Sequence, residues 1–173
     1  HGAHRRFLET DYEVRGFIYL TMKELGTSWS GSFVDAVKGI PVGRKARGLV
    51  ILGSSGTLAQ SRQPTELGRV VLHYRDGATA RLPLIWGRDF VAFWEDPRQF
   101  QQPRLAWYMP MENGWGSDST SLFEMRLVNP HPERVIESID LEATEQYWSA
   151  PIFVAITLQE VAAAPLRDPP GQP

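Results

Sequence analysis

Residues 69–86 read RVVLHYRDGATARLPLIW, and this stretch decides the fold. It holds two runs that are rich in β-branched, aromatic and other apolar residues, as strands are. The runs flank Asp76-Gly77, and an Asp-Gly pair supplies the positive φ angles that a tight type I′ turn requires. The stretch therefore predicts two antiparallel strands, residues 69–75 and 79–86, joined by a two-residue turn.

The alternation of side chains predicts where this hairpin lies in its sheet. Leu82, Leu84 and Trp86 fall on one face of the second strand, so Pro83 points to the other face. Proline has no backbone N–H to donate, which confines it to edge strands and bulges. We therefore expect the second strand to lie at a sheet edge or to carry a bulge at Pro83.

Similar short apolar runs recur along the chain. The 15 Gly and 13 Pro are spread between these runs instead of being pooled in one linker, which is typical of all-β domains. No stretch shows the sustained apolar period of an amphipathic helix, and we expect only a short helical turn near residues 89–94. The hairpin and the other runs predict about eight or nine strands in an antiparallel two-sheet sandwich of jelly-roll type. The other candidate strands are residues 12–25, 47–53, 104–109, 121–128, 134–141 and 152–159.

The same alternation predicts which residues form the core, because one face of each strand points inward. We expect residues 1–161 to form one sandwich domain, with a loose start over residues 1–6. Residues 162–173 are small and rich in proline, and they are expected to form an extended tail or linker. The residues predicted to be buried are Leu49, Ile51, Val70, Leu72, Phe123, Leu127, Ile139, Phe153 and Ala155.

Composition excludes several classes of protein. The 173 residues are 42% hydrophobic and 22% charged, which suits one globular domain. The 18 Lys+Arg nearly balance the 20 Asp+Glu, whereas nucleic-acid binders usually show a basic excess. No apolar run reaches the roughly 18 residues that would span a membrane. Because the chain has no cysteine, disulfides, Cys zinc sites and thiol catalysis are excluded as well.

The sequence also lacks the motifs of catalysis. It contains no Gly-x-Ser-x-Gly, no His-Glu-x-x-His and no Walker loop, so we expect a protein that is not an enzyme and needs no cofactor. Asp140 and Glu142 alternate on a predicted strand. They are expected either to pair with an arginine of the basic cluster at residues 43–47 or to bind a calcium ion, as loop carboxylates of sandwiches do.

The aromatic residues predict a binding site for carbohydrate. The apolar C–H face of a pyranose stacks on exposed aromatic rings, while carboxylates and amides bind its hydroxyl groups. Two loops combine these residue types. Instead of binding a sugar, these loops could pack on the sandwich itself or contact another copy of the chain. The candidate site residues are Tyr108, Glu112, Asn113, Trp115 and Asp118 in the first loop and Tyr147 and Trp148 in the second.

Six further segments carry a family resemblance. They are residues 39–52, 68–77, 82–89 with Trp94, 104–107, 128–134 with 138–140, and 150–158. In this order they resemble bacterial β-sandwich accessory domains with galactose-binding-like (jelly-roll) architecture. Such domains occur beside glycoside hydrolases and in exported sigma-factor regulatory proteins. The sequence departs from that pattern at Trp86, where tyrosine is more usual, and at Phe93, where tryptophan is common.

The resemblance implies a non-catalytic carbohydrate-binding or carbohydrate-associated module with a polysaccharide or glycan as partner. It also implies an extracytoplasmic location, either secreted or at the cell surface. Because residue 1 is histidine, we expect the chain to be a processed or trimmed piece. Two alternatives stay open: an assembly module that forms oligomers or filaments through its loops and tail, and an exported sensory domain of a membrane-bound regulator.

Overall fold

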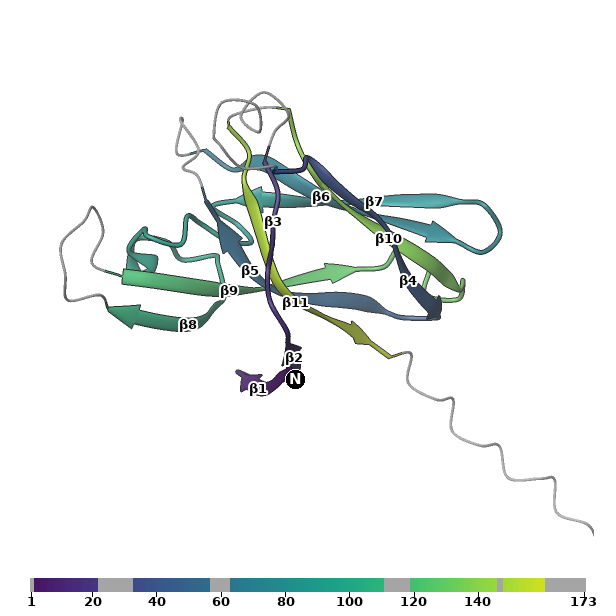
Figure 1. Cartoon of the computed structure of the whole chain (residues 1–173), viewed down its shortest axis with the longest axis horizontal. Helices are drawn as coiled ribbons and strands as arrows, with labels where there is room; N and C mark the ends of the chain where they lie inside the picture. Colours follow the sequence, from purple (N-terminus) through teal and green to yellow (C-terminus); the bar gives the residue numbers. More distant parts are fainter. Residues whose placement is uncertain (1, 22–32, 57–62, 111–118, 146–147, 161–173) are drawn as a thin grey trace, which may run out of the picture.

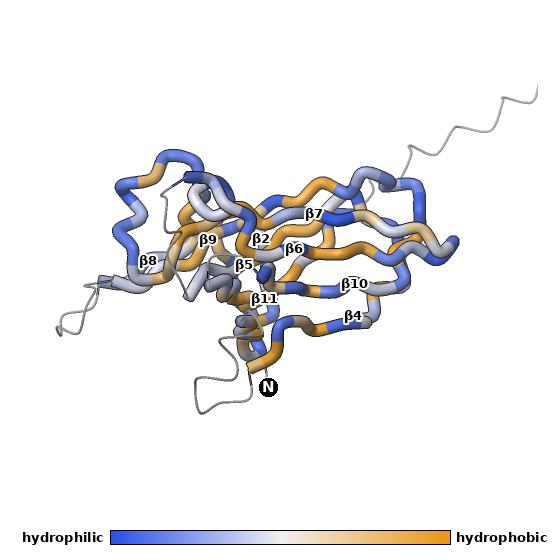
Figure 2. Tube along the Cα trace, turned by 90° about the horizontal axis from the view of Figure 1, so that it is seen from above, coloured by the Kyte–Doolittle hydropathy of each residue, from blue (hydrophilic) through white to orange (hydrophobic). Residues whose placement is uncertain are grey.

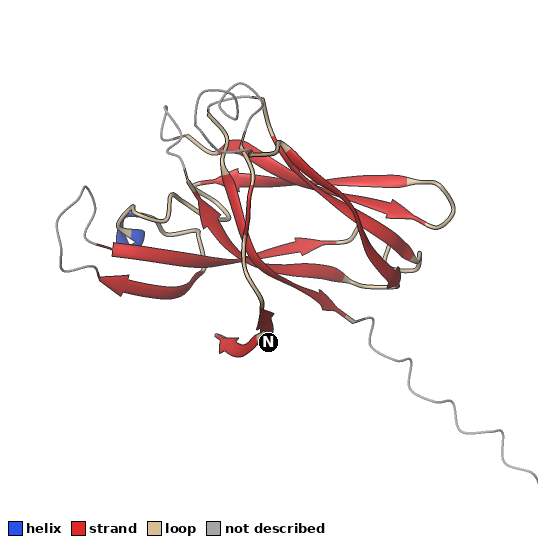
Figure 3. Cartoon of the chain, viewed as in Figure 1, coloured by secondary structure: helices blue, strands red, loops and turns tan. Residues whose placement is uncertain are grey.

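The computed structural model of the chain is an antiparallel β-sandwich (Figures 1 and 3), which confirms the predicted fold class. It describes residues 2–21, 33–56, 63–110, 119–145 and 148–160. Within these ranges the only helix is a 3-10 turn, η1 (Pro97–Gln99), and no helix is long and apolar enough to cross a membrane. The strands, more numerous than expected, are β1 (Ala3–Phe7), β2 (Thr10–Val14), β3 (Ile18–Tyr19), β4 (Ala36–Arg44), β5 (Gly48–Ser55), β6 (Thr65–Tyr74), β7 (Thr79–Trp86), β8 (Leu105–Pro110), β9 (Ser119–Val128), β10 (Ile136–Ala143) and β11 (Pro151–Gln159).

Two sheets face each other across the core. One has four strands in the order β4-β10-β6-β7, and the other has five in the order β3-β11-β5-β9-β8. Strands β1 and β2 form a separate hairpin. Seen from above, hydrophilic residues concentrate in the connections at the ends of the sandwich, while hydrophobic residues recur along its strands (Figure 2).

The predicted hairpin is confirmed, and its second strand lies at a sheet edge as expected. β6 and β7 pair in antiparallel fashion, and β7 is the outermost strand of the four-stranded sheet. Leu82, Leu84 and Trp86 are buried, whereas Pro83 is exposed. The missing N–H of the proline therefore interrupts no pairing with a further strand on that side.

The turn of this hairpin differs from the prediction. The N–H of Gly77 donates to the carbonyl of Tyr74, and the N–H of Tyr74 donates to the carbonyl of Ala78, both at 2.9 Å. Gly77 has a φ of 86°, but Asp76 is not among the residues with positive φ. The loop thus has three residues and a left-handed glycine, and the predicted two-residue type I′ turn is wrong.

We expect Gly77→Ala to lower the free energy of unfolding by about 1–2 kcal/mol, because a side chain disfavours left-handed backbone. A Cβ built on Gly77 has no neighbour within 4 Å, so the cost comes from the backbone alone. Gly16 has equally open surroundings without a positive φ. Urea denaturation should therefore show a smaller loss for Gly16→Ala, and equal losses would contradict the explanation.

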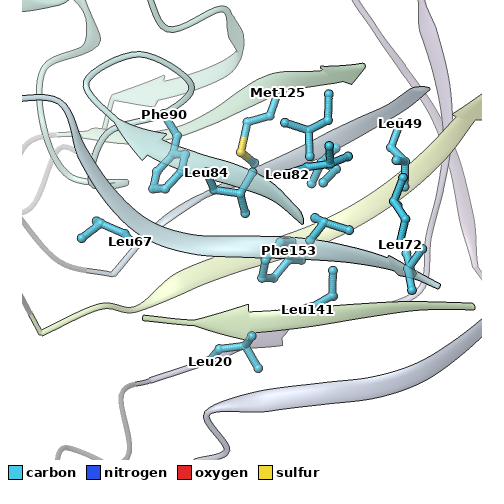
Figure 4. Packing of buried hydrophobic residues seen from close by; sticks show 14 of the residues in the cluster. Leu20, Leu49, Leu67, Leu72, Leu82, Leu84, Phe90, Met125, Leu141 and Phe153 are labelled. Carbon is cyan, nitrogen blue, oxygen red and sulfur yellow. The ribbon is translucent and has the colours of Figure 1, made fainter. Parts of the chain in front are cut away.

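The core lies between the two sheets, where side chains from both point toward one another (Figure 4). All the residues predicted to be buried are buried except Ala155, which is partly buried. A register shift in β11 between Phe153 and Ala155 breaks the alternation. Phe153 packs in the core, but Val154 and Ala155 both pack in a second cluster on the outer face of the five-stranded sheet.

The N-terminal hairpin covers that outer face. Residues 1–6 were expected to be loose, but β1 pairs with β2 along its whole length. Tyr12 of β2 is buried in the second cluster together with Val50 and Leu52 of β5. Every residue of β5 is consequently buried, because the core lies on one side and the second cluster on the other.

The one helical turn also differs from the prediction. Residues 87–89 and 93–94 form turns, and the 3-10 turn comes later, at Pro97–Gln99. Its first turn is stabilised by Asp96, whose carboxylate accepts the N–H of Arg98 at 3.0 Å. Proline at the first helical position and an aspartate cap fix this turn locally.

Candidate binding site

The structure separates the predicted aromatic residues that it describes. Tyr108 lies on β8, and Trp148 precedes β11. β9 and β5 lie between these two strands, so at a spacing of about 4.8 Å per strand they are about 14 Å apart. The two rings therefore do not rise from neighbouring strands of one platform. The other predicted members, Glu112, Asn113, Trp115, Asp118 and Tyr147, lie outside the described residues.

Trp148 is held in an unusual conformation. It is 60% exposed and has a φ of 55°, a left-handed backbone that is rare for a bulky residue. The next residue is buried, and its hydroxyl, Ser149 Oγ, donates to the carbonyl of Leu67. Thr144 Oγ1 donates to the carbonyl of Glu66 at 3.1 Å. These bonds attach the segment to β6, while the indole of Trp148 is left in solvent.

A short insertion widens the five-stranded sheet near the start of β9. The N–H of Ser55 donates to the carbonyl of Val91 at 3.2 Å, and the N–H of Phe93 returns a bond to the carbonyl of Ser55 at 2.9 Å. On the other side, the N–H of Ser121 donates to the carbonyl of Phe93 at 2.8 Å. Residues 91–93 thus lie between β5 and β9, which pair directly only up to Gly53 and Phe123.

An apolar groove of about 510 Å³ crosses the outer face beside the N-terminal hairpin. Ile152, Val154 and Leu122 contribute to its lining from β11 and β9. Phe17 and Tyr19 line it from the chain segment that leads into and forms β3, and Phe93 lines it from the insertion. We call this hollow the outer-face groove.

A second hollow of about 420 Å³ meets the groove at Phe17. Both hollows are lined by Gly16, Phe17 and Val154, but the second also contains Glu13 and Arg15. Arg15 pairs with the Glu13 carboxylate at 2.6 Å on the molecular surface. Phe17 is 72% exposed, so it forms an aromatic ridge between the apolar groove and a hollow in which Glu13 and Arg15 lie beside further apolar residues. We call Phe17, Glu13 and Arg15 the Phe17 ridge.

The residues of this ridge combine two kinds of interaction. An exposed phenyl ring offers a flat apolar face, and a carboxylate and a guanidinium offer acceptors and fixed donors for hydroxyl groups. Sequence reasoning assigned Phe17 to a long strand over residues 12–25 and missed its exposure. Gly16 was the available signal, because a glycine inside a strand pattern often marks a break in that strand.

Asp140 and Glu142 have other partners than expected. Asp140 accepts the N–H of Gly39 at 2.7 Å and pairs with His73 Nε2 at 2.9 Å. Burial alone would raise the pKa of Asp140, but these hydrogen bonds lower it below its ordinary value. Glu142 lies 3.8 Å from Arg69. Their partners are therefore His73 and Arg69 instead of the cluster at residues 43–47, and the part of the chain that the structure describes has no group of three or more His, Asp or Glu that could hold a metal ion.

Comparison with known proteins does not indicate a function, so the function is inferred from the chemistry of the site. No protein-family model matches the chain, and no curated protein is significantly similar to it. The resemblance to galactose-binding-like accessory domains therefore stays a prediction. The same holds for the extracytoplasmic location and for the alternatives of an assembly module and a sensory domain.

Proposed function

We propose that the chain is a non-catalytic, extracytoplasmic module that binds a polysaccharide or glycan at the Phe17 ridge. The observation that carries this proposal is the exposure of Phe17 between the outer-face groove and the Glu13–Arg15 ion pair. Aromatic rings that remain in solvent beside polar side chains are typical of ligand-binding surfaces.

The chemistry of a sugar suits both sides of the ridge. A pyranose has an apolar C–H face, which stacks on the Phe17 ring and is removed from water there. Its hydroxyl groups lie at the ring edge, where Glu13 accepts and Arg15 donates hydrogen bonds. Because the groove continues on the far side of Phe17, a chain of several sugar units fits this surface better than a single unit.

We further propose the galactose-binding-like (jelly-roll) architecture, and the order of the strands supports it. Leaving out β1, β2 and the edge strand β8, the remaining strands can be numbered 1 to 8 from β3 to β11. Without β8, the order β3-β11-β5-β9 becomes 1-8-3-6. The order β4-β10-β6-β7 of the other sheet becomes 2-7-4-5. This order is the one expected of a double-sheet jelly roll built from two Greek keys, and it supports the proposed architecture.

We expect Phe17→Ala to weaken binding to a soluble polysaccharide roughly five- to hundredfold, the equivalent of losing one aromatic contact of about 1–3 kcal/mol. The thermal midpoint should stay nearly unchanged, because the ring is mostly in solvent. Affinity electrophoresis against xylan, β-glucan and mannan identifies a binding polysaccharide, and titration calorimetry measures the change. Val128→Ala is the matched control, since Val128 is 77% exposed at the far end of β9 and should leave affinity unchanged.

The same titration distinguishes the ridge from the loops predicted from sequence. Loss of affinity in Trp148→Ala together with an unchanged Phe17→Ala would move the site to the loops and refute the ridge. If the wild type binds none of the polysaccharides, carbohydrate binding itself is contradicted for these polymers.

A further inference from the structure

One sheet edge carries few of the features that usually prevent strands from pairing between molecules. β8 forms the free edge of the five-stranded sheet (Figure 1), contains no charged residue and has its one proline, Pro110, as its last residue. Leu105, Tyr108 and Met109 are exposed on it, between 37% and 45%. An uncharged, apolar edge strand with free backbone groups is a template for another strand.

The other edges of the two sheets are protected. Edge strand β7 carries Arg81 and Pro83, and edge strand β4 carries Lys38 and Pro41. Charges and proline on an edge oppose pairing with a further strand. β3, at the remaining edge, has only two residues. Among the described strands β8 is therefore the edge best suited to intermolecular pairing.

The hydrogen bonds of Ser121 show which backbone groups of β8 are free. Tyr108 is the register partner of Ser121, but the N–H of Ser121 donates to Phe93 on the opposite side of β9. In an antiparallel ladder the two members of a hydrogen-bonded pair exchange both of their bonds. Tyr108 and Ser121 are therefore a non-hydrogen-bonded pair, and the N–H and C=O of Tyr108 point to the open edge.

We propose that β8 pairs with β8 of a second copy in antiparallel orientation, about a two-fold axis at Tyr108. Each Tyr108 N–H donates to the carbonyl of the partner's Tyr108, which makes a hydrogen-bonded pair at the centre. The axis stands perpendicular to the sheet, as closed two-fold pairing of identical antiparallel strands requires. The two five-stranded sheets then form one continuous sheet.

The side chains of β8 are compatible with this self-pairing. Two-fold symmetry at residue 108 sets Trp107 opposite the partner's Met109, and the reverse. Both positions lie on the outer face, since they are the register partners of Leu122 and Thr120. Indole and thioether groups make favourable contacts, and no like charges meet along the strand. Because β8 is uncharged and its side chains match those of an identical strand, a second copy of this chain suits it better than a charged partner does.

The arrangement adds to the proposed function without depending on it. Both outer faces lie on the same side of the joined sheet, so both Phe17 ridges face the same way. Two sites that engage one polymer chain bind more tightly than one site.

A cysteine at the axis tests the proposal directly, because the chain has no cysteine of its own. In a central hydrogen-bonded pair the two Cα atoms are about 5.5 Å apart, within the reach of a disulfide. Tyr108→Cys should therefore form a linked dimer under mild oxidation. Pro110→Cys should not, because its two copies are offset by four residues, or about 14 Å. Val128→Cys, at an exposed residue of β9, gives the rate of random collision.

Sedimentation velocity supplies the reversible measurement. The wild type should shift from 19.5 kDa toward twice that mass at concentrations of about 10–100 μM, since a small interface is weak. Tyr108→Pro removes the outward N–H without breaking the β8–β9 ladder and should stay monomeric, whereas Tyr108→Phe should behave as wild type. If Tyr108→Pro fails to fold, Met109→Lys provides the edge charge instead. A wild type that stays at 19.5 kDa, or a Tyr108→Cys that crosslinks no faster than Val128→Cys, overturns the proposal.

Discussion

Replacing Trp86 by alanine should lower the free energy of unfolding by about 3–5 kcal/mol. The side chain is 1% exposed in the core between the sheets. Its ring packs edge-on against Phe100 with centroids 5.4 Å apart. Its Nε1–H donates to the Glu95 carboxylate at 3.2 Å, and the same carboxylate accepts the N–H of Ala92 at 2.9 Å. Truncation removes the packing, leaves a cavity and takes one donor from Glu95.

Urea denaturation at neutral pH measures this loss. Trp86→Phe keeps most of the apolar volume but loses the hydrogen bond, so it should cost about 1–2 kcal/mol and separate the two contributions. Val128→Ala should be nearly neutral, because Val128 lies mostly in solvent. If Trp86→Ala were as stable as the wild type, the indole would not be a central core residue.

The β6–β7 hairpin was predictable because its determinants are local. Alternation over residues 69–86 fixes which face of each strand is buried, and Pro83 indicates an edge strand. The type of turn was not predictable from Asp76-Gly77 alone. The same pair fits a two-residue loop and a three-residue loop with a left-handed glycine, and the pairing of Tyr74 with Ala78 decides between them.

Features that depend on distant contacts could not be predicted. The register shift in β11 places Ala155 on the outer face, and nothing in the local sequence marks it. β1 has a polar sequence, AHRRF, that predicts no strand. It is ordered because β2 supplies its pairing partner and anchors the hairpin through Tyr12, which is buried against β5.

The candidate site was likewise predictable only where it depends on local sequence. Exposed aromatic residues beside carboxylates were expected, and Tyr108 and Trp148 are indeed exposed. The outer-face groove, however, joins the segment before β3, the insertion at residues 91–93 and four strands of the sheet. Such a hollow arises from the arrangement of elements far apart in sequence, so periodicity along one strand could not indicate it.

Glu124 holds the N-terminal hairpin to the sheet through its carboxylate. The side chain is fully buried on β9. One carboxylate oxygen accepts hydrogen bonds from Thr10 Oγ1 at 3.0 Å and from Tyr12 Oη at 3.1 Å. The other oxygen lies 2.8 Å from Arg126 Nε and 3.0 Å from Arg104 Nε. A buried carboxylate with this many donors is fully satisfied, and an amide in its place turns an NH2 group toward donors on one of its two sides.

These bonds also set the titration of the pair. Burial alone would raise the pKa of Glu124, but the hydrogen bonds from Arg126, Thr10 and Tyr12 lower it below its ordinary value. The pKa of the Tyr12 phenol is raised, chiefly by burial, so it remains a neutral donor. Because the folded state lowers the pKa of Glu124, its contribution to stability is present above the unfolded-state pKa of about 4.3. That contribution is lost as pH falls through the lower pKa of the folded state.

Glu124→Gln should therefore cost about 2–4 kcal/mol at pH 7, and the difference from wild type should shrink as pH falls from about 5 to 3. Urea denaturation at several pH values measures both quantities. Glu137→Gln is the matched control, since Glu137 forms an exposed pair with Arg75 and should cost less than about 1 kcal/mol. A Glu124→Gln difference that stays constant with pH would contradict this assignment. Glu13 belongs to β2, so acid that releases the hairpin from Glu124 should also weaken binding at the Phe17 ridge.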